Sequence, residues 1–144
     1  MALLMHISGL MADSTKTILL VDDDADLREL LTIAVRYLGY NVVVAATGKE
    51  AVERASTGQP NLILMDIDLP NFDGAEATAK IKRNRKTGHI PIVILTGFGI
   101  SPDTKRALES GAAEILRKPV SILKIKEVLR KHLPVEVETS RKEI

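Results

Sequence analysis

The chain has 144 residues, 45% of them hydrophobic, which fits one globular domain with a single core. Twenty basic and 19 acidic residues leave a formal charge of +1, which gives no electrostatic footprint for nucleic acid. The absence of cysteine excludes disulfides and thiolate chemistry. The near-neutral charge leads us to expect protein partners. The longest apolar runs are far shorter than the roughly 20 residues of a membrane helix, so we expect a soluble cytoplasmic protein.

The first ten residues, MALLMHISGL, are apolar, but no basic region precedes them and no small-residue cleavage site follows. This pattern argues against a signal peptide, and Met11 offers an alternative start. We expect residues 1–16 to form a flexible leader, or to be extra sequence from a misassigned start. Residues 17–133 are expected to form the domain, and the polar residues 134–144 a flexible tail.

From Thr17 onward, short apolar runs alternate with helix-like segments. The runs predict strands at Thr17–Val21, Asn41–Ala45, Leu62–Met65, Pro91–Leu95 and Glu114–Leu116. The first helix is predicted by one apolar face of a 3.6-residue period, made of Leu27, Leu30, Leu31, Ala34, Val35 and Leu38. We expect Gly39 to end this helix.

Four more helices are predicted, three of them behind an N-cap residue. The second runs from Lys49 to Ser56, and the third from about Gly74 to Arg85 behind an N-cap at Asp73. The fourth begins at Ser101-Pro102 and ends at Gly111. Ser121 caps the last helix, whose apolar stripe is Ile122, Ile125, Val128, Leu129 and Leu133. Repeated βαβ units of this kind predict a parallel sheet with helices on both faces.

Polar residues stand at the end of four of these strands. Asp22 and Asp23 follow the first, Asp66 the third, Thr96 the fourth and Lys118 the fifth. Because open α/β sheets bind ligands at the carboxyl ends of their strands, we expect these side chains to converge on one site.

This set of residues suits phosphoryl transfer. Asp22, Asp23 and Asp66 supply the carboxylates that Mg²⁺ prefers, and Lys118 supplies a counter-charge. A carboxylate can also accept a phosphoryl group, and Asp66 is the best candidate because it ends its strand alone. Thr96 would donate its hydroxyl to the arriving group, and Gly97 would leave room for it.

Four blocks, ILLVDDD, LILMDIDLPNFDG, PIVILTG and GAAEILRKP, closely resemble the signature blocks of the response-regulator receiver domain of two-component signalling. The resemblance runs from Thr17 to about Leu133. It implies a flavodoxin-like (βα)5 fold, a doubly wound parallel sheet of five strands in the order 2-1-3-4-5.

The resemblance also assigns roles by block. It implies that Asp22 and Asp23 organise the metal, Asp23 more directly, and that the main-chain carbonyl of Asp68 completes the metal shell. It implies that Asp66 is the phosphoacceptor. Thr96 would be the switch hydroxyl and Lys118 the phosphate-pairing base, with a cis bond from Lys118 to Pro119.

The implied function is that of a receiver in a phosphorelay. A histidine kinase or histidine phosphotransfer protein would phosphorylate Asp66 in the presence of Mg²⁺, and the output would be a change in binding to a downstream protein. As a stand-alone regulator or a relay intermediate, the chain would catalyse only its own phosphorylation and dephosphorylation. A homodimer would form through the last two helices and the fifth strand.

One position departs from the family pattern. Receivers usually carry Tyr, Phe or His where this chain has Ile115, and that ring normally swings inward when the threonine moves. We hypothesise that Phe98, two residues past Thr96, takes over part of this coupling.

Two other functions are compatible with some of these residues. A haloacid-dehalogenase-like phosphatase also uses an aspartate nucleophile, Mg²⁺, a threonine and a lysine, and its DxD motif would be Asp66-Ile-Asp68. That family places DxD on its first strand and its acidic pair late, which reverses the order seen here. An inert pseudo-receiver scaffold is disfavoured because all five site residues are present.

Overall fold

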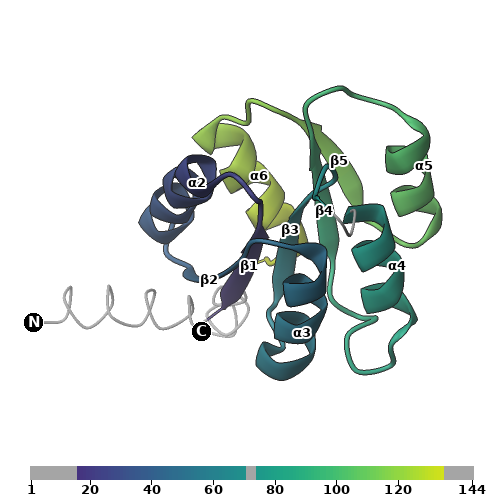
Figure 1. The fold of residues 1–144 in the computed structure, drawn as a ribbon. Helices are drawn as coiled ribbons and strands as arrows, with labels where there is room; N and C mark the ends of the chain where they lie inside the picture. Colours follow the sequence, from purple (N-terminus) through teal and green to yellow (C-terminus); the bar gives the residue numbers. More distant parts are fainter. Residues whose placement is uncertain (1–15, 71–73, 135–144) are drawn as a thin grey trace, which may run out of the picture.

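The computed structural model describes residues 16–70 and 74–134, in which strands and helices alternate (Figure 1). In chain order the elements are β1 (Thr17–Val21), α2 (Ala25–Tyr37), β2 (Asn41–Ala45), α3 (Gly48–Gly58), β3 (Leu62–Asp66), α4 (Gly74–Arg83), β4 (Ile92–Thr96), α5 (Pro102–Glu109), β5 (Glu114–Arg117) and α6 (Ile122–His132). Residues 1–15 of the predicted leader, most of the predicted tail and the predicted N-cap Asp73 lie outside the described residues.

The five strands form one parallel sheet in the order β2-β1-β3-β4-β5, as the family resemblance implied. The chain therefore adds β2 on one side of β1 and then adds β3, β4 and β5 in succession on the other side. In a doubly wound sheet, the carboxyl ends of the strands on either side of this point flank the ligand crevice.

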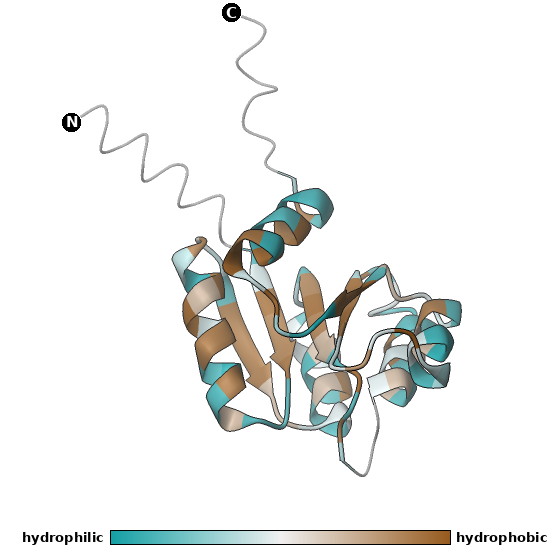
Figure 2. Ribbon diagram, turned by 90° about the horizontal axis from the view of Figure 1, so that it is seen from above, coloured by the Kyte–Doolittle hydropathy of each residue, from teal (hydrophilic) through white to brown (hydrophobic). Residues whose placement is uncertain are grey.

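Helices cover both faces of the sheet. The helices α2 and α6 lie on one face, and α3, α4 and α5 lie on the other (Figure 1). Successive residues of β1 point to opposite faces, so that Ile18 and Leu20 join the layer under α2 and α6 while Leu19 and Val21 join the other layer. The strands accordingly read as continuous apolar runs, and Figure 2 shows them in brown between the helices.

The predicted helix caps form with local hydrogen bonds. The Asp24 carboxylate accepts from the backbone N–H groups of Asp26 and Leu27 at the start of α2. At α5, Ser101 and Thr104 form a reciprocal capping box, and Ser121 caps α6. The first helix ends as expected, since Gly39 has a φ of 102°.

Two apolar residues of the predicted core-facing stripes are exposed in the structure. Leu30 of α2 is 62% exposed and Ile122 of α6 is 41% exposed, whereas Leu31, Val35 and Ile125 are buried. The prediction was wrong for these two because α2 has more apolar positions than one face of the sheet can cover, and because α6 turns Ile122 away at its first residue.

Element boundaries differ from the predicted ones by up to two residues. The strand β3 includes Asp66, β4 runs from Ile92 to Thr96, and α4 ends at Arg83. As a result Asp66 and Thr96 are the last residues of their strands, while Lys118 comes directly after β5. In the part of the chain that the structure describes, no helix has the length and apolarity to cross a membrane.

Candidate functional site

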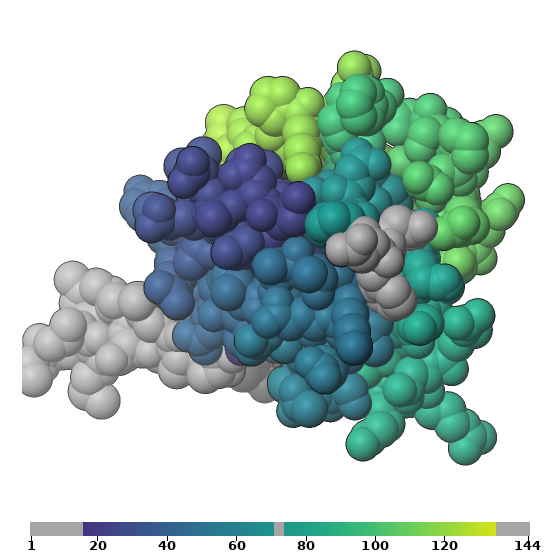
Figure 3. Space-filling view, viewed as in Figure 1, coloured from purple at the N-terminus to yellow at the C-terminus, as the bar shows by residue number. Residues whose placement is uncertain are grey.

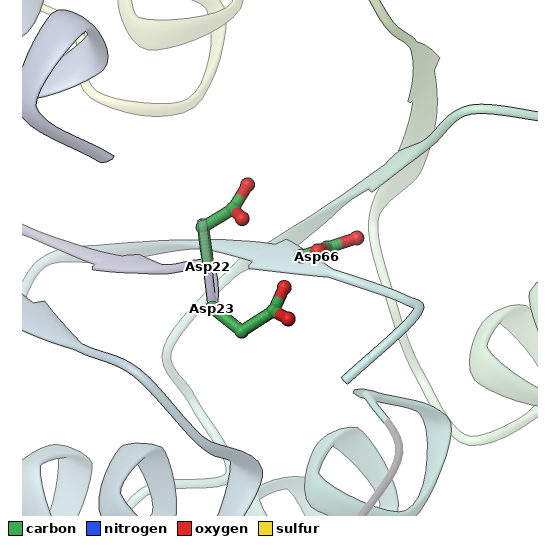
Figure 4. Close-up of side chains that lie close together, drawn as sticks. All are labelled: Asp22, Asp23 and Asp66. Atoms are coloured by element: carbon green, nitrogen blue, oxygen red, sulfur yellow. The ribbon is translucent and has the colours of Figure 1, made fainter. Parts of the chain in front are cut away.

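Three carboxylates meet at the carboxyl end of the sheet. Asp22 and Asp23 follow β1, and Asp66 ends the neighbouring strand β3. One carboxylate oxygen from each residue lies within 4.8 Å of the others. Figure 4 shows the three side chains projecting from these strand ends into the same space. The structure thus brings together the acids that the sequence pattern selected.

Asp22 is held in place from three directions. Its Oδ1 accepts from the backbone N–H of Asp24 at 2.9 Å, and its main-chain carbonyl accepts from Nη1 of Arg28 at 2.8 Å. The Lys118 ammonium lies 3.2 Å from its Oδ2. The side chain of Asp22 is buried, whereas Asp23 is exposed. Asp22 is therefore a fixed member of the cluster, and Asp23 is the acid open to solvent.

Asp66 is a buried carboxylate with an unusual proton affinity. Its Oδ1 accepts from the backbone N–H of Asp68 at 3.1 Å and lies 3.3 Å from Nζ of Lys118. Burial raises the pKa of Asp66 from 3.8 to about 6, and the Asp22 charge acts in the same direction. The hydrogen bond from Asp68 and the charge of Lys118 oppose this shift only in part.

The Lys118 ammonium lies close to both buried carboxylates, those of Asp22 and Asp66. Burial alone would lower the pKa of its ammonium, but the carboxylates of Asp66 and Asp22 outweigh that effect and raise it. The backbone N–H of Lys118 donates to the Thr96 carbonyl at 2.7 Å, which fixes the lysine beside β4. The bond between Lys118 and Pro119 is cis, as the family resemblance implied.

Thr96 ends β4 with a buried side chain. Its hydroxyl oxygen accepts from the backbone N–H of Phe98 at 3.1 Å. A Cβ added to Gly97 would meet no described atom within 4 Å, so no protein contact requires glycine at that position. The threonine is therefore tied to the loop between β4 and α5.

The position that usually carries an aromatic ring is filled by a packed aliphatic side chain. Ile115 lies on β5 and packs against the apolar layer between the sheet and α3, α4 and α5. Phe98, in contrast, is 80% exposed. The backbone N–H of Phe98 is hydrogen-bonded to the Thr96 hydroxyl, whereas Ile115 packs against the core.

Two residues that shape the site, Gly74 and Arg28, were not predicted from the sequence. A Cβ on Gly74, the first residue of α4, would overlap the main-chain carbonyl of Asp66, so only glycine lets α4 approach this closely. Arg28 anchors the main chain at Asp22. The glycine lies inside one of the quoted blocks and could have been noticed, but nothing in the sequence marks Arg28.

The cluster suits a hard divalent cation. Mg²⁺ favours one or two carboxylates and retains several waters, and the exposed Asp23 would leave one side open to them. Asp22, Asp23 and Asp66 would hold the ion, and the Asp68 side chain is exposed and is not one of these three acids. When bound, Mg²⁺ would neutralise negative charge that develops on phosphoryl oxygens.

Comparison with known proteins agrees with the fold. The family model described as response regulator receiver domain matches residues 18–130. The chain is 31% identical over 119 residues to the polar-differentiation response regulator DivK of Brucella ovis, covering 83% of this chain and 97% of DivK. It is 36% identical over 127 residues to the phosphate regulon transcriptional regulatory protein PhoB of Pseudomonas aeruginosa, covering 85% of this chain. The match spans only 56% of PhoB.

Solved structures give the same result. The receiver domain of sensor histidine kinase PA1611 from Pseudomonas aeruginosa, with a magnesium ion coordinated in its active-site cleft, aligns with a TM-score of 0.78. Its identity is 31%, over 83% of this chain and 98% of that one. The chemotaxis protein CheY4 of Vibrio cholerae aligns with a TM-score of 0.76 and 28% identity, over 83% and 99% of the two chains. The chain belongs to the response regulator receiver domain family, and it is a signalling domain of two-component systems.

Replacing Asp66 by asparagine is expected to stabilise the metal-free domain at neutral pH. Because the folded state raises the pKa of Asp66 from 3.8 to about 6, the stability contributed by this carboxyl is complete below pH 3.8 and is lost as pH rises through about 6. An asparagine side chain does not ionise and so loses no stability in this range. The expected gain in the free energy of unfolding at pH 7.5 is on the order of 2 kcal/mol.

Urea unfolding in EDTA at pH 4 and pH 7.5 measures this effect. The advantage of Asp66→Asn over the wild type should grow between the two pH values, while the exposed control Asp68→Asn should match the wild type at both. An advantage of equal size at both pH values would show that the carboxyl of Asp66 is not destabilised by its surroundings.

Proposed function

We propose that Asp66 accepts a phosphoryl group from a histidine kinase or a histidine phosphotransfer protein, in the presence of Mg²⁺. The observation that carries this proposal is a buried carboxylate at a strand end with an acidic pair on one side and a lysine 3.3 Å away on the other. Magnesium in the active-site cleft of the similar PA1611 receiver supports the choice of cation.

The chain's own residues would position and neutralise the transferred group. A carboxylate oxygen of Asp66 forms the new P–O bond while the P–N bond of the donor phosphohistidine breaks; the imidazole nitrogen keeps the bonding electron pair and takes a proton from solvent. Lys118, already beside Asp66, pairs with a phosphoryl oxygen. The Thr96 hydroxyl donates to a second oxygen. On this proposal, the site catalyses only its own phosphorylation and the hydrolysis that reverses it.

The output would be a change of protein partner. To donate to the phosphoryl group, Thr96 has to move, and its hydroxyl is the acceptor for the Phe98 backbone. Since Ile115 is partly buried and packs against the core, we infer that the loop that carries the exposed Phe98 is the part of the site that responds.

Replacing Phe98 by alanine is therefore expected to weaken binding of the downstream protein at least several-fold, because an exposed aromatic side chain beside the switch is lost. The rate of phosphorylation by acetyl phosphate should stay near that of the wild type. Leu123→Ala, at an exposed residue on α6, is the matched control. If Phe98→Ala changes neither phosphorylation nor partner binding, Phe98 has no role in coupling.

A haloacid-dehalogenase-like phosphatase is the alternative from the enzyme class, but the family match and the strand order belong to receivers. A test separates the two functions from each other and from an inert scaffold. With Mg²⁺ and acetyl phosphate, a receiver takes up at most one phosphoryl group per chain and shows no sustained turnover of p-nitrophenyl phosphate. Sustained turnover that Asp66→Asn abolishes would establish the phosphatase, and no uptake at all would establish the scaffold.

Several finer predictions rest on the resemblance and the sequence. These are binding to a downstream protein, a cytoplasmic location, the domain limits at residues 17–133, and a homodimer through α5, β5 and α6. Size-exclusion chromatography with light scattering, before and after phosphorylation, measures the last of these. The main-chain carbonyl of Asp68 as a metal ligand likewise stays a prediction.

A further inference from the structure

The two acids of the pair that follows β1 are held in different ways. Asp22 is fixed through its own side chain, which accepts from the backbone N–H of Asp24 and pairs with Lys118. The side chain of Asp23 is exposed, and within residues 16–70 and 74–134 it forms no hydrogen bond or ion pair. Its carboxylate nevertheless lies within 4.8 Å of those of Asp22 and Asp66 (Figure 4). The direction of Asp23 therefore depends on the backbone that carries it.

Arg28 holds that backbone. Its Nη1 donates to the main-chain carbonyl of Asp22 at 2.8 Å, and this carbonyl belongs to the same peptide group as the N–H of Asp23. The N–H of Asp22 donates to the carbonyl of Ala45 on β2 at 3.1 Å. The chain that leaves β1 is thus bound to β2 just before Asp22 and to Arg28 just after it. A hydrogen bond from a charged donor is also stronger than one between neutral groups.

Arg28 itself has a defined place between α2 and α3. Its backbone N–H donates to the Asp24 carbonyl at 2.9 Å in the first turn of α2, and its side chain is partly buried. The pKa of Glu50 on α3 is lowered first by a hydrogen bond from Ala46 and then by Arg54, and the charge of Arg28 adds to this effect. Figure 3 shows the purple atoms at the start of α2 next to the blue atoms of α3.

Two simpler roles for Arg28 predict different effects on the metal site. If the hydrogen bond to Asp22 only stabilises the fold, its loss lowers the Tm and leaves the affinity for a cation unchanged. If Arg28 acts only as a nearby positive charge, it repels a divalent cation, and its loss strengthens cation binding. A role in positioning Asp23 predicts the opposite sign, because its loss weakens cation binding.

We propose that Arg28 is a positioning residue for the metal site. By holding the peptide between Asp22 and Asp23, it keeps the Asp23 carboxylate directed at the space that this residue shares with Asp22 and Asp66. The inference rests on the proposed Mg²⁺ site. Partners that orient metal ligands typically contribute about 10–100-fold to affinity, and here the oriented ligand has no other restraint among the described residues.

Titration calorimetry with Mg²⁺ tests the sign of the effect. Arg28→Met keeps the aliphatic length of the side chain and removes both its charge and its hydrogen bond. We expect its Kd for Mg²⁺ to rise on the order of tenfold, although the lost charge alone would lower the Kd. The titration is run at a temperature at which far-UV circular dichroism shows every variant folded, so that a change in stability does not enter the Kd.

The backbone amide of Asp23 gives a second measurement that needs no metal. In EDTA, its NMR order parameter should lie near the rigid value of about 0.85 in the wild type and fall toward about 0.6 in Arg28→Met. The amides of β1 should keep their wild-type values, since their ladder hydrogen bonds remain. A loss of order limited to Asp23 and its neighbours would locate the effect at the peptide that Arg28 binds.

A conservative variant and a matched control complete the design. Arg28→Lys keeps the charge and one donor but lacks the planar guanidinium, so its Kd should lie between those of the wild type and Arg28→Met. Arg54→Met is the matched control, because Arg54 pairs with the same Glu50 at 3.2 Å but lies on α3 and is exposed. It should leave both the Kd and the Asp23 amide unchanged.

Three results would overturn the proposal. An unchanged Kd in Arg28→Met together with a lower Tm would leave Arg28 a purely structural role. A lower Kd in Arg28→Met would show that its charge dominates. An Asp23 amide that stays rigid in Arg28→Met would show that the peptide does not need Arg28. A wild type that binds no Mg²⁺ would contradict the proposed function, and the amide measurement would still decide whether Arg28 holds the peptide.

Discussion

The double variant Asp22→Asn, Asp23→Asn is expected to bind Mg²⁺ on the order of a hundredfold more weakly than the wild type. The structure brings three carboxylates within 4.8 Å of one another, and this variant removes two of the three charges. Asp66 alone, paired with Lys118, is a poor site for a divalent cation. Phosphorylation by acetyl phosphate should fall in parallel at any Mg²⁺ concentration that only the wild type can bind.

Thermal unfolding with increasing Mg²⁺ measures this affinity, because a ligand that binds the folded state raises the Tm with its concentration. Asp24→Asn, at the residue next to the acidic pair, is the control. The Asp24 side chain caps α2, and asparagine caps a helix equally well. An Asp22→Asn, Asp23→Asn protein that Mg²⁺ still stabilises as strongly as the wild type would place the cation elsewhere.

Replacing Lys118 by alanine should slow phosphorylation of Asp66 on the order of a hundredfold, even though the nucleophile is untouched. The ammonium lies 3.3 Å from Asp66 and 3.2 Å from Asp22, so it is positioned to neutralise a phosphoryl oxygen without further reorganisation. Its removal also leaves two buried carboxylates without their cation. We expect the metal-free protein to lose about 1–2 kcal/mol of stability at pH 7.

The two effects of Lys118 can be separated. Raising Mg²⁺ should recover most of the stability of Lys118→Ala, because a cation then neutralises the acids, but it should not recover the rate. Lys124→Ala, at an exposed residue of α6, is the control for loss of a lysine. A Lys118→Ala protein phosphorylated at the wild-type rate would remove the lysine from the mechanism.

The sequence predicted which side chains lie together at this edge of the sheet because each of these residues adjoins an apolar run. A short run such as Leu62–Met65, apolar throughout, indicates a strand buried on both faces, and repeated βα units place the ends of all the strands at the same edge. Asp22, Asp66 and Thr96 could therefore be brought together without knowledge of the tertiary contacts.

The contacts that tune the site could not be predicted in this way. The pairing of Lys118 with Asp22 joins residues 96 positions apart, and its distance depends on how β5 closes the sheet. The raised pKa of Asp66 follows from its burial, which the composition of a strand does not reveal. Arg28 was missed because an arginine on an exposed helix usually meets only solvent.

The error at Leu30 has a physical cause. A period of 3.6 residues shows that a helix is apolar on some face, but α2 carries apolar residues on two faces. The sheet covers the face with Leu31 and Val35, and Leu30 joins Ile33 and Tyr37 on the other. The sequence pattern assigned Leu30 to the core, whereas the fold leaves it exposed.

The central claim is that Asp66 carries the phosphoryl group. Its most direct test is incubation with acetyl phosphate and Mg²⁺, followed by intact-mass measurement and peptide mapping at low pH. We expect one phosphoryl group per chain, located on Asp66, stable to acid, labile to base and hydroxylamine, and absent from Asp66→Asn. A wild-type chain that gains no phosphoryl group, or an Asp66→Asn chain that gains one at the wild-type rate, would contradict the account.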